Sequence, residues 1–126
     1  AVVDWFGPTR VERMSHHPSR IDHDAPDSPE SQLAGGPVQQ NPEADTRLNP
    51  ARYASSDDPP FLIQHGDADP LVPMEQSEIL AEALRAAGAQ VEFDVLRGAG
   101  HGGPAFQTPE NLERVRQFFD RTLKQR

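Results

Sequence analysis

Apolar and polar positions follow regular periods mainly in the second half of the chain. An apolar run directly after Pro59-Pro60 predicts a strand over residues 61–65. Residues 91–96 alternate apolar and polar side chains, which predicts a second strand. Between them, residues 74–87 carry an apolar stripe at helical spacing that ends at Gly88, formed by Ile79, Leu80, Ala83, Leu84 and Ala87.

The two ends of the chain predict one further helix and one further strand. Thr108 and Pro109 fit the N-cap and the first position of a helix, and an apolar face follows, formed by Leu112, Val115, Phe118, Phe119 and Leu123. Ala1–Phe6 is an apolar run closed by Gly7-Pro8, as expected for a buried strand that enters a turn. This first strand has no residues before it, so we expect a larger protein cut at or near Ala1; a processed terminus that pairs locally is the alternative.

These elements predict the α/β class, with a short parallel sheet of about three strands and flanking helices. The 126 residues fit one domain. We divide it into a strand and turn (1–9), an irregular stretch (10–60) and a strand–helix–strand–helix unit (61–126).

Residues 10–60, called the excursion below, have a different composition. They hold eight of the thirteen prolines and three of the five histidines, and their apolar residues keep no period for long. The excursion is therefore either a cover over a folded body or a disordered linker, with single turns of helix around 28–33 and 50–54. Its polar cluster has the right residue types for a divalent metal but no preformed geometry, so we expect no metal site at His16, His17, Asp22, His23 and Asp24.

Charge and hydropathy argue against nucleic-acid binding and against a membrane span. The formal net charge is -8 and no Lys/Arg cluster is present, which argues against a nucleic-acid partner. No apolar run approaches the ~20 residues of a membrane span, and no signal peptide is visible. The chain has no cysteine, so disulfides and thiolate metal sites are excluded, and the compartment stays undetermined.

Two loops that follow strands carry the candidate chemistry. Asp69 lies in His65-Gly66-Asp67-Ala68-Asp69-Pro70, and His101 lies in Gly98-Ala99-Gly100-His101-Gly102-Gly103. Because functional groups of α/β sheets gather at the carboxyl ends of strands, both side chains are expected on one rim. There a carboxylate can fix the tautomer of an imidazole. Taken singly, each aspartate can be a turn residue and the histidine a solvated loop residue; Asp67 fits a turn or supporting position better than Asp69 does.

The chain resembles bacterial α/β-hydrolase esterases. Within them it is most similar to the feruloyl/acetyl esterase-like group, and it is distantly similar to prolyl-oligopeptidase-type domains. The resemblance rests on residues 1–9, 27–37, 65–73 and 98–103. It implies a partial α/β-hydrolase fold, Asp69 as the acid and His101 as the general base of a serine triad. It also implies that Ala1–Phe6 lies two strands after the nucleophile strand and that the excursion covers the cleft. Arg10 departs from the group, which usually has an acidic residue there.

The nucleophile of such enzymes is absent from the sequence. No Gly-x-Ser-x-Gly elbow occurs, and the oxyanion donor that follows that serine is missing with it. We therefore expect the C-terminal half of a serine esterase or lipase, acting on a small acyl or aryl ester without a cofactor, that is inactive alone. A non-catalytic module that self-associates through its open sheet edge, or pairs with a missing N-terminal half, is the alternative. An unusual nucleophile such as Ser55 is a third reading.

Trp5 and Phe6 have two interpretations. They can line an acyl pocket at the end of the first strand, or they can be ordinary buried aromatic residues of that strand.

Overall fold

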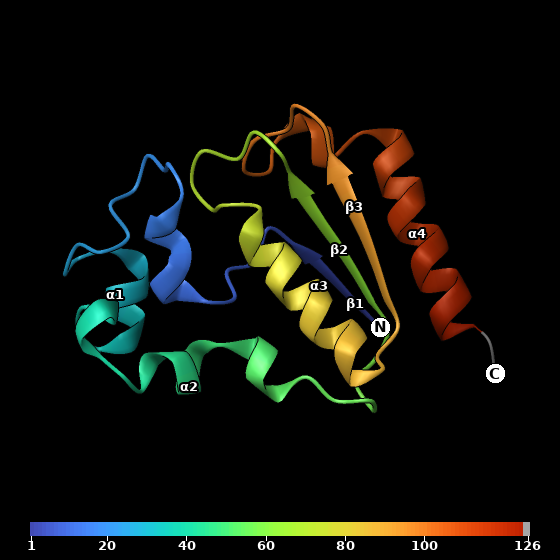
Figure 1. Cartoon of the computed structure of the whole chain (residues 1–126). Coiled ribbons are helices and arrows are strands. Elements are labelled where there is room, and N and C mark those ends of the chain that lie inside the picture. The colour runs from blue at the N-terminus through green and yellow to red at the C-terminus, as the bar shows by residue number, and fades with distance from the viewer. Residues whose placement is uncertain (125–126) are drawn as a thin grey trace.

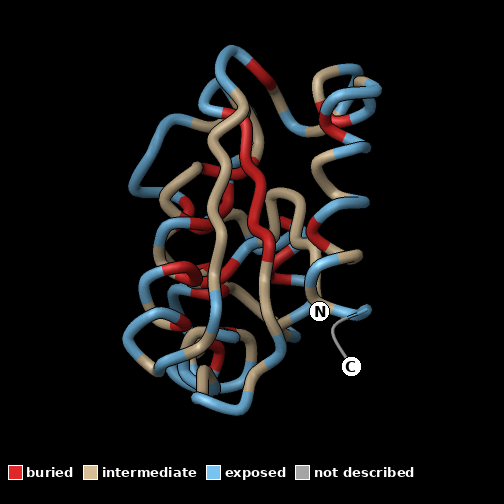
Figure 2. The backbone as a smooth tube through the Cα atoms, turned by 90° about the vertical axis from the view of Figure 1, so that its right-hand side faces the viewer, coloured by how far each residue is buried: buried red, intermediate tan, exposed pale blue. Residues whose placement is uncertain are grey.

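Three parallel strands form the centre of the computed structural model, which describes residues 1–124 (Figure 1). Their order is β1 (Val2–Trp5), β2 (Phe61–Gly66) and β3 (Val91–Leu96), with Val2 opposite Phe61 and Phe61 opposite Val91. The central strand β2 is buried along almost all of its length, as Figure 2 shows. The predicted α/β class and the parallel sheet of about three strands are confirmed.

Two long helices flank the sheet. Helix α3 (Glu75–Ala87) packs on the face to which Ile63 points, and this core also contains Leu80, Ala81 and Leu84. Helix α4 (Pro109–Leu123) packs on the other face, where Asn111 Oδ1 accepts a hydrogen bond of 2.8 Å from the Gln64 side chain. Because neighbouring side chains of a strand point to opposite faces, residues 63 and 64 reach different helices.

The helix ends agree with the sequence prediction, whereas one apolar face does not. Thr108 caps α4, and Gly88 ends α3 with φ 93°, a left-handed conformation that favours glycine. The expected apolar face of α4 is wrong in part. Phe118 is fully buried, but Leu112 is 48% exposed and Leu123 is 56% exposed. Besides Phe118, ion pairs hold the helix on the sheet, since the Arg114 guanidinium contacts the carboxylates of Asp94 and Glu92 on β3.

The excursion is folded into short helices joined by turns. They are η1 (Val11–His16), α1 (Pro29–Ala34), η2 (Val38–Gln40), α2 (Ala44–Leu48) and η3 (Pro50–Tyr53), of which α1 and η3 lie where single turns were predicted. Val11, Met14 and Val38 form a small core with Val72, which comes from the loop after β2. The excursion therefore packs against the loop that carries Asp69.

Among the helices described for residues 1–124, none has both the length and the apolar character needed to cross a membrane.

Candidate functional site

The loops after β2 and β3 lie against each other at the carboxyl ends of the strands. The Ala68 amide donates to the Ala99 carbonyl over 3.0 Å. A Cβ at Gly66 would overlap backbone atoms of Ala99 and Gly100, so only glycine lets the two loops approach this closely. The close approach brings the two predicted site residues onto one rim.

Asp69 and His101 form a hydrogen-bonded pair. His101 Nδ1 lies 2.9 Å from Asp69 Oδ2. The Asp69 side chain is only 1% exposed, whereas that of His101 is 30% exposed. The other carboxylate oxygen of Asp69 accepts from the amides of Leu71 and Val72 at 2.8 and 2.9 Å. A buried carboxylate held by two amides gives the imidazole a fixed partner, while the ring itself reaches the surface.

A second, fully buried histidine also contacts Asp69. His65 Nε2 lies 2.9 Å from the Val72 carbonyl and 3.2 Å from Asp69 Oδ2, so this nitrogen carries the proton. His65 Nδ1 is then the acceptor for the Ser77 hydroxyl at 2.6 Å. Sequence reasoning missed His65 and Ser77 as supports of the acid. His65 belongs to β2 and precedes Asp69 by four residues, a spacing that predicts a contact within a helix but not across the end of a strand. Ser77 belongs to α3, so its contact with His65 is not visible in the sequence.

Asp67 joins the two loops rather than the pair. Its carboxylate accepts from the Gly98 amide over 2.6 Å and lies 3.7 Å from Arg97. This agrees with the supporting position that the sequence favoured for it.

An aromatic platform lies beneath the imidazole. The rings of Phe6 and His101 have centroids 4.2 Å apart, and Phe6 meets Phe106 edge-on at 5.1 Å. Phe6 has φ 50°, a strained conformation for a bulky side chain. Phe6 lies just past the end of β1 and, with Trp5, lines a cleft of about 380 Å³ that also contains His101. Both aromatic residues therefore belong to the wall of the site.

The excursion holds a Ser-His-acid arrangement of its own, of which His23 and Glu30 line this cleft. His23 is 1% exposed, and its Nδ1 lies 3.0 Å from Glu30 Oε1. His23 Nε2 lies 3.0 Å from Ser19 Oγ and 2.8 Å from the Leu71 carbonyl. Because a carbonyl oxygen can only accept, Nε2 must carry a proton and cannot act as the base for Ser19. This arrangement ties the excursion to the Asp69 loop and is not a second triad.

Three more polar residues of the excursion that the sequence singled out have structural partners. His17 pairs with Glu75 at 3.0 Å, and Arg10 pairs with Glu12 at 2.7 Å. Ser55 Oγ donates to Asp57 over 2.6 Å. The neighbouring Ser56 lies beside Gly88, which ends α3 before β3 begins. Ser55 therefore lies toward the opposite end of the sheet from His101 and does not belong to this site.

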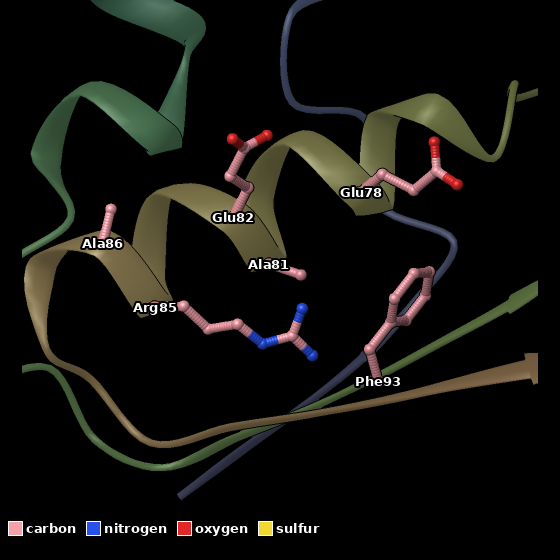
Figure 3. Close-up of a pocket in the computed structure, with 6 residues that line it drawn as sticks. All are labelled: Glu78, Ala81, Glu82, Arg85, Ala86 and Phe93. Atoms are coloured by element: carbon pink, nitrogen blue, oxygen red, sulfur yellow. The ribbon is translucent and has the colours of Figure 1, made fainter.

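A larger hollow of about 660 Å³ lies elsewhere, between α3 and β3 (Figure 3). It is lined by Glu78, Ala81, Glu82, Arg85, Ala86 and Phe93. It is open toward the helix surface and contains neither Asp69 nor His101. The smaller cleft beside His101 is the better candidate because it joins apolar walls with a hydrogen-bonded acid and base.

Several known proteins with similar sequences or structures are esterases or peptidases. Esterase LipC of Mycobacterium tuberculosis is 38% identical over 66 residues, which cover 52% of this chain and 16% of that protein. A truncated carbohydrate esterase from gut microbiota has TM-score 0.85 and 34% identity, covering 96% of this chain and 41% of that one. A Mycobacterium tuberculosis puromycin-hydrolyzing peptidase has TM-score 0.75 and 27% identity, covering 96% of this chain and 18% of that one.

The chain thus spans less than half the length of these relatives. Residues 1–84 match the BD-FAE family. The sheet, the two rim loops and these similarities lead to one conclusion: the chain has part of an α/β-hydrolase fold and belongs to the BD-FAE family.

Proposed function

We propose that this chain supplies the acid and the base of a Ser-His-Asp carboxylic-ester hydrolase, whose serine comes from outside these 126 residues. The observation that carries the proposal is the 2.9 Å contact between His101 Nδ1 and the buried Asp69 carboxylate. Esterases among the relatives support the reaction class.

The proposed mechanism is acyl transfer. With Nδ1 engaged by Asp69, Nε2 of His101 is the nitrogen left to take the proton of a serine hydroxyl as it attacks the ester carbonyl. His101 then returns that proton to the leaving alcohol, and the acyl-serine is hydrolysed by the same route in reverse order. Asp69 stabilises the imidazolium that forms in each half of the reaction. No Gly-x-Ser-x-Gly is present, so the chain alone is expected to be inactive.

The test joins the natural upstream segment to this chain and measures hydrolysis of a short-chain aryl ester. Asp69→Asn and His101→Ala should each reduce kcat by about 10⁴-fold, because either change leaves the serine without an oriented base. His16→Ala is the control, since His16 is an exposed histidine of the excursion. Full activity in both site variants would overturn the proposal.

A non-catalytic role through the open sheet edge is the second candidate. Strand β1 lies at the edge of the described sheet and has a hydrogen-bonded neighbour, β2, on one side. Unpaired strand edges favour association with another chain. Sedimentation velocity of the chain alone tests this role. Self-association that Val3→Pro abolishes supports an edge contact, and a folded, strictly monomeric chain contradicts it.

A further inference from the structure

The loop after β3 does not by itself determine where the His101 imidazole points. The residues at positions 100, 102 and 103 are glycines, and Gly102 and Gly103 have φ 75° and 83°. The loop therefore supplies no side chain on either side of the ring, and the His101 side chain is 30% exposed. Two contacts reach the ring from other segments: the Asp69 carboxylate at Nδ1 and the phenyl ring of Phe6.

The backbone of Phe6 breaks the alternation of β1. Successive side chains of a strand point to opposite faces. Trp5 and Phe6 are successive residues, yet both contact Phe106, at centroid separations of 5.5 and 5.1 Å. Phe6 has φ 50° and is the only non-glycine residue with positive φ among residues 1–124. This left-handed conformation turns the phenyl ring away from the course of the strand and toward the rim that carries His101.

Backbone and side-chain contacts hold Phe6 in this unfavourable conformation. The Phe6 amide donates to the Gln64 carbonyl over 3.0 Å, and the Gly7 amide donates to Asp4 Oδ1 over 3.0 Å. A Cβ at Gly7 would lie 2.7 Å from that same oxygen, so a larger residue there would displace the Asp4 carboxylate. Strained conformations of this kind persist where the surrounding structure over-determines them, and they cluster at functional sites.

The phenyl ring contacts the imidazole and lies beside the glycine that follows it. The centroids of the Phe6 and His101 rings are 4.2 Å apart, with the planes tilted by 48°. A Cβ at Gly102 would lie 3.4 Å from Phe6 Cζ. We propose that Phe6 is a positioning residue, whose ring keeps the His101 imidazole in the rotamer in which Nδ1 stays on Asp69. This assignment rests on the proposed function only for the view that His101 is the base.

The orientation of the imidazole matters because its two nitrogens have different roles. With Nδ1 on Asp69, Nε2 is the nitrogen left for a serine hydroxyl. A change of the His101 rotamer breaks the contact with Asp69 and turns Nε2 away with it. Contact between two aromatic rings shifts an equilibrium between two arrangements by about twofold to tenfold. Loss of the Phe6 ring should therefore raise the fraction of unpaired His101 by that factor.

The experiment follows the Nδ1 proton of His101 by NMR in the isotope-labelled chain, at one pH for all variants. Its resonance is the one that His101→Ala removes. The exchange rate of this proton with water reports how often the contact with Asp69 opens. Phe6→Gly removes the ring and relieves the strain of the left-handed backbone. The exchange rate should then rise about twofold to tenfold.

Two variants separate positioning from packing. Phe6→Tyr retains the ring and should keep the wild-type exchange rate. Phe119→Ala removes another half-buried phenyl ring, on α4 and outside the cleft, and should keep that rate even where thermal unfolding shows lower stability. If Phe6→Gly fails to fold, nuclear Overhauser contacts between the Phe6 and His101 rings in the unaltered chain decide, and their absence contradicts the assignment.

Three results of the exchange measurement would also overturn it. They are an unchanged rate in folded Phe6→Gly, an equal rise in Phe119→Ala, and a wild-type proton that exchanges too fast to be observed. None of these measurements involves the serine or turnover, so their failure leaves the proposed esterase activity to its own test.

Discussion

The sheet half (β1 and residues 61–124) and the excursion satisfy their backbone groups in different ways. In the sheet half, backbone ladders join the three strands, and aliphatic side chains such as Ile63 and Leu84 fill the space beneath α3. In the excursion, buried polar side chains supply much of the order, among them His23, Ser28 and Ser31. Polar side chains thus satisfy backbone groups where no regular ladder does so. The excursion is ordered even though its sequence has no regular period.

The first prediction compares the two cores. Leu84→Ala in the sheet half and Met14→Ala in the excursion remove fully or nearly fully buried side chains. Each should lower the free energy of unfolding by about 2–5 kcal/mol, because each leaves a cavity. Urea unfolding measures both. An unchanged midpoint for Met14→Ala alone would show that the excursion does not unfold together with the sheet.

The second prediction concerns the approach of the rim loops. Gly66→Ala places a methyl group against the Ala99 and Gly100 backbone and should cost about 1–3 kcal/mol or more. Gly100→Ala is the matched control, since its methyl group would meet nothing closer than Pro70 Cδ at 3.9 Å. Thermal unfolding compares the two variants. Equal transition temperatures would contradict the role assigned to Gly66.

The third prediction compares a helix cap in each region. Thr108 caps α4 and Ser28 caps α1, each by accepting a backbone amide at 3.1 Å. Thr108→Ala should cost about 1 kcal/mol, near the middle of the range for lost caps. Ser28→Ala should cost about 2 kcal/mol, because the buried Ser28 hydroxyl also donates within the excursion. Chemical denaturation gives both values, and a smaller loss for Ser28→Ala would reverse the comparison.

The smallest expected effects come from two aspartates with opposite pKa shifts. Burial raises the pKa of Asp4 above its ordinary 3.8, despite a hydrogen bond from the Gly7 amide. A hydrogen bond from Asn49 lowers the pKa of Asp45 in the excursion, despite slight desolvation, and Arg52 and Arg10 lower it further. Folding therefore disfavours the charged form of Asp4 and favours that of Asp45.

The pH dependence of the two asparagine variants should differ in sign. For Asp4 the folded state binds the proton more tightly, so wild-type stability falls as pH rises from 3.8 through the raised pKa. Asp4→Asn should remove that decline. Asp45 stabilises the fold above pH 3.8, and this contribution is lost as pH falls through its lowered pKa, so Asp45→Asn should weaken the fold near neutral pH. Unfolding curves between pH 3 and 7 test both, and the same sign for both variants would refute the assignment.

Sequence alone predicted the three strands, the two long helices and the proximity of Asp69 to His101. Strand β3 was predicted with both ends, and helix α3 to within one residue, because apolar spacing and Gly88 specify them locally. Asp69 and His101 were predicted on one rim because parallel strands bring their carboxyl ends together. Their roles in catalysis stay a proposal.

Only the tertiary structure decided which distant side chains support that pair. Phe6, just past the end of β1, contacts the ring of His101, and Ser77 of α3 contacts His65, which lies beside Asp69. His23 and Glu30 reach the same cleft from the excursion. Contacts of this kind depend on packing between segments far apart in the chain, which no local period encodes. The exposed Leu112 and Leu123 of α4 show the same limit, because periodicity identifies an apolar face but not what covers it.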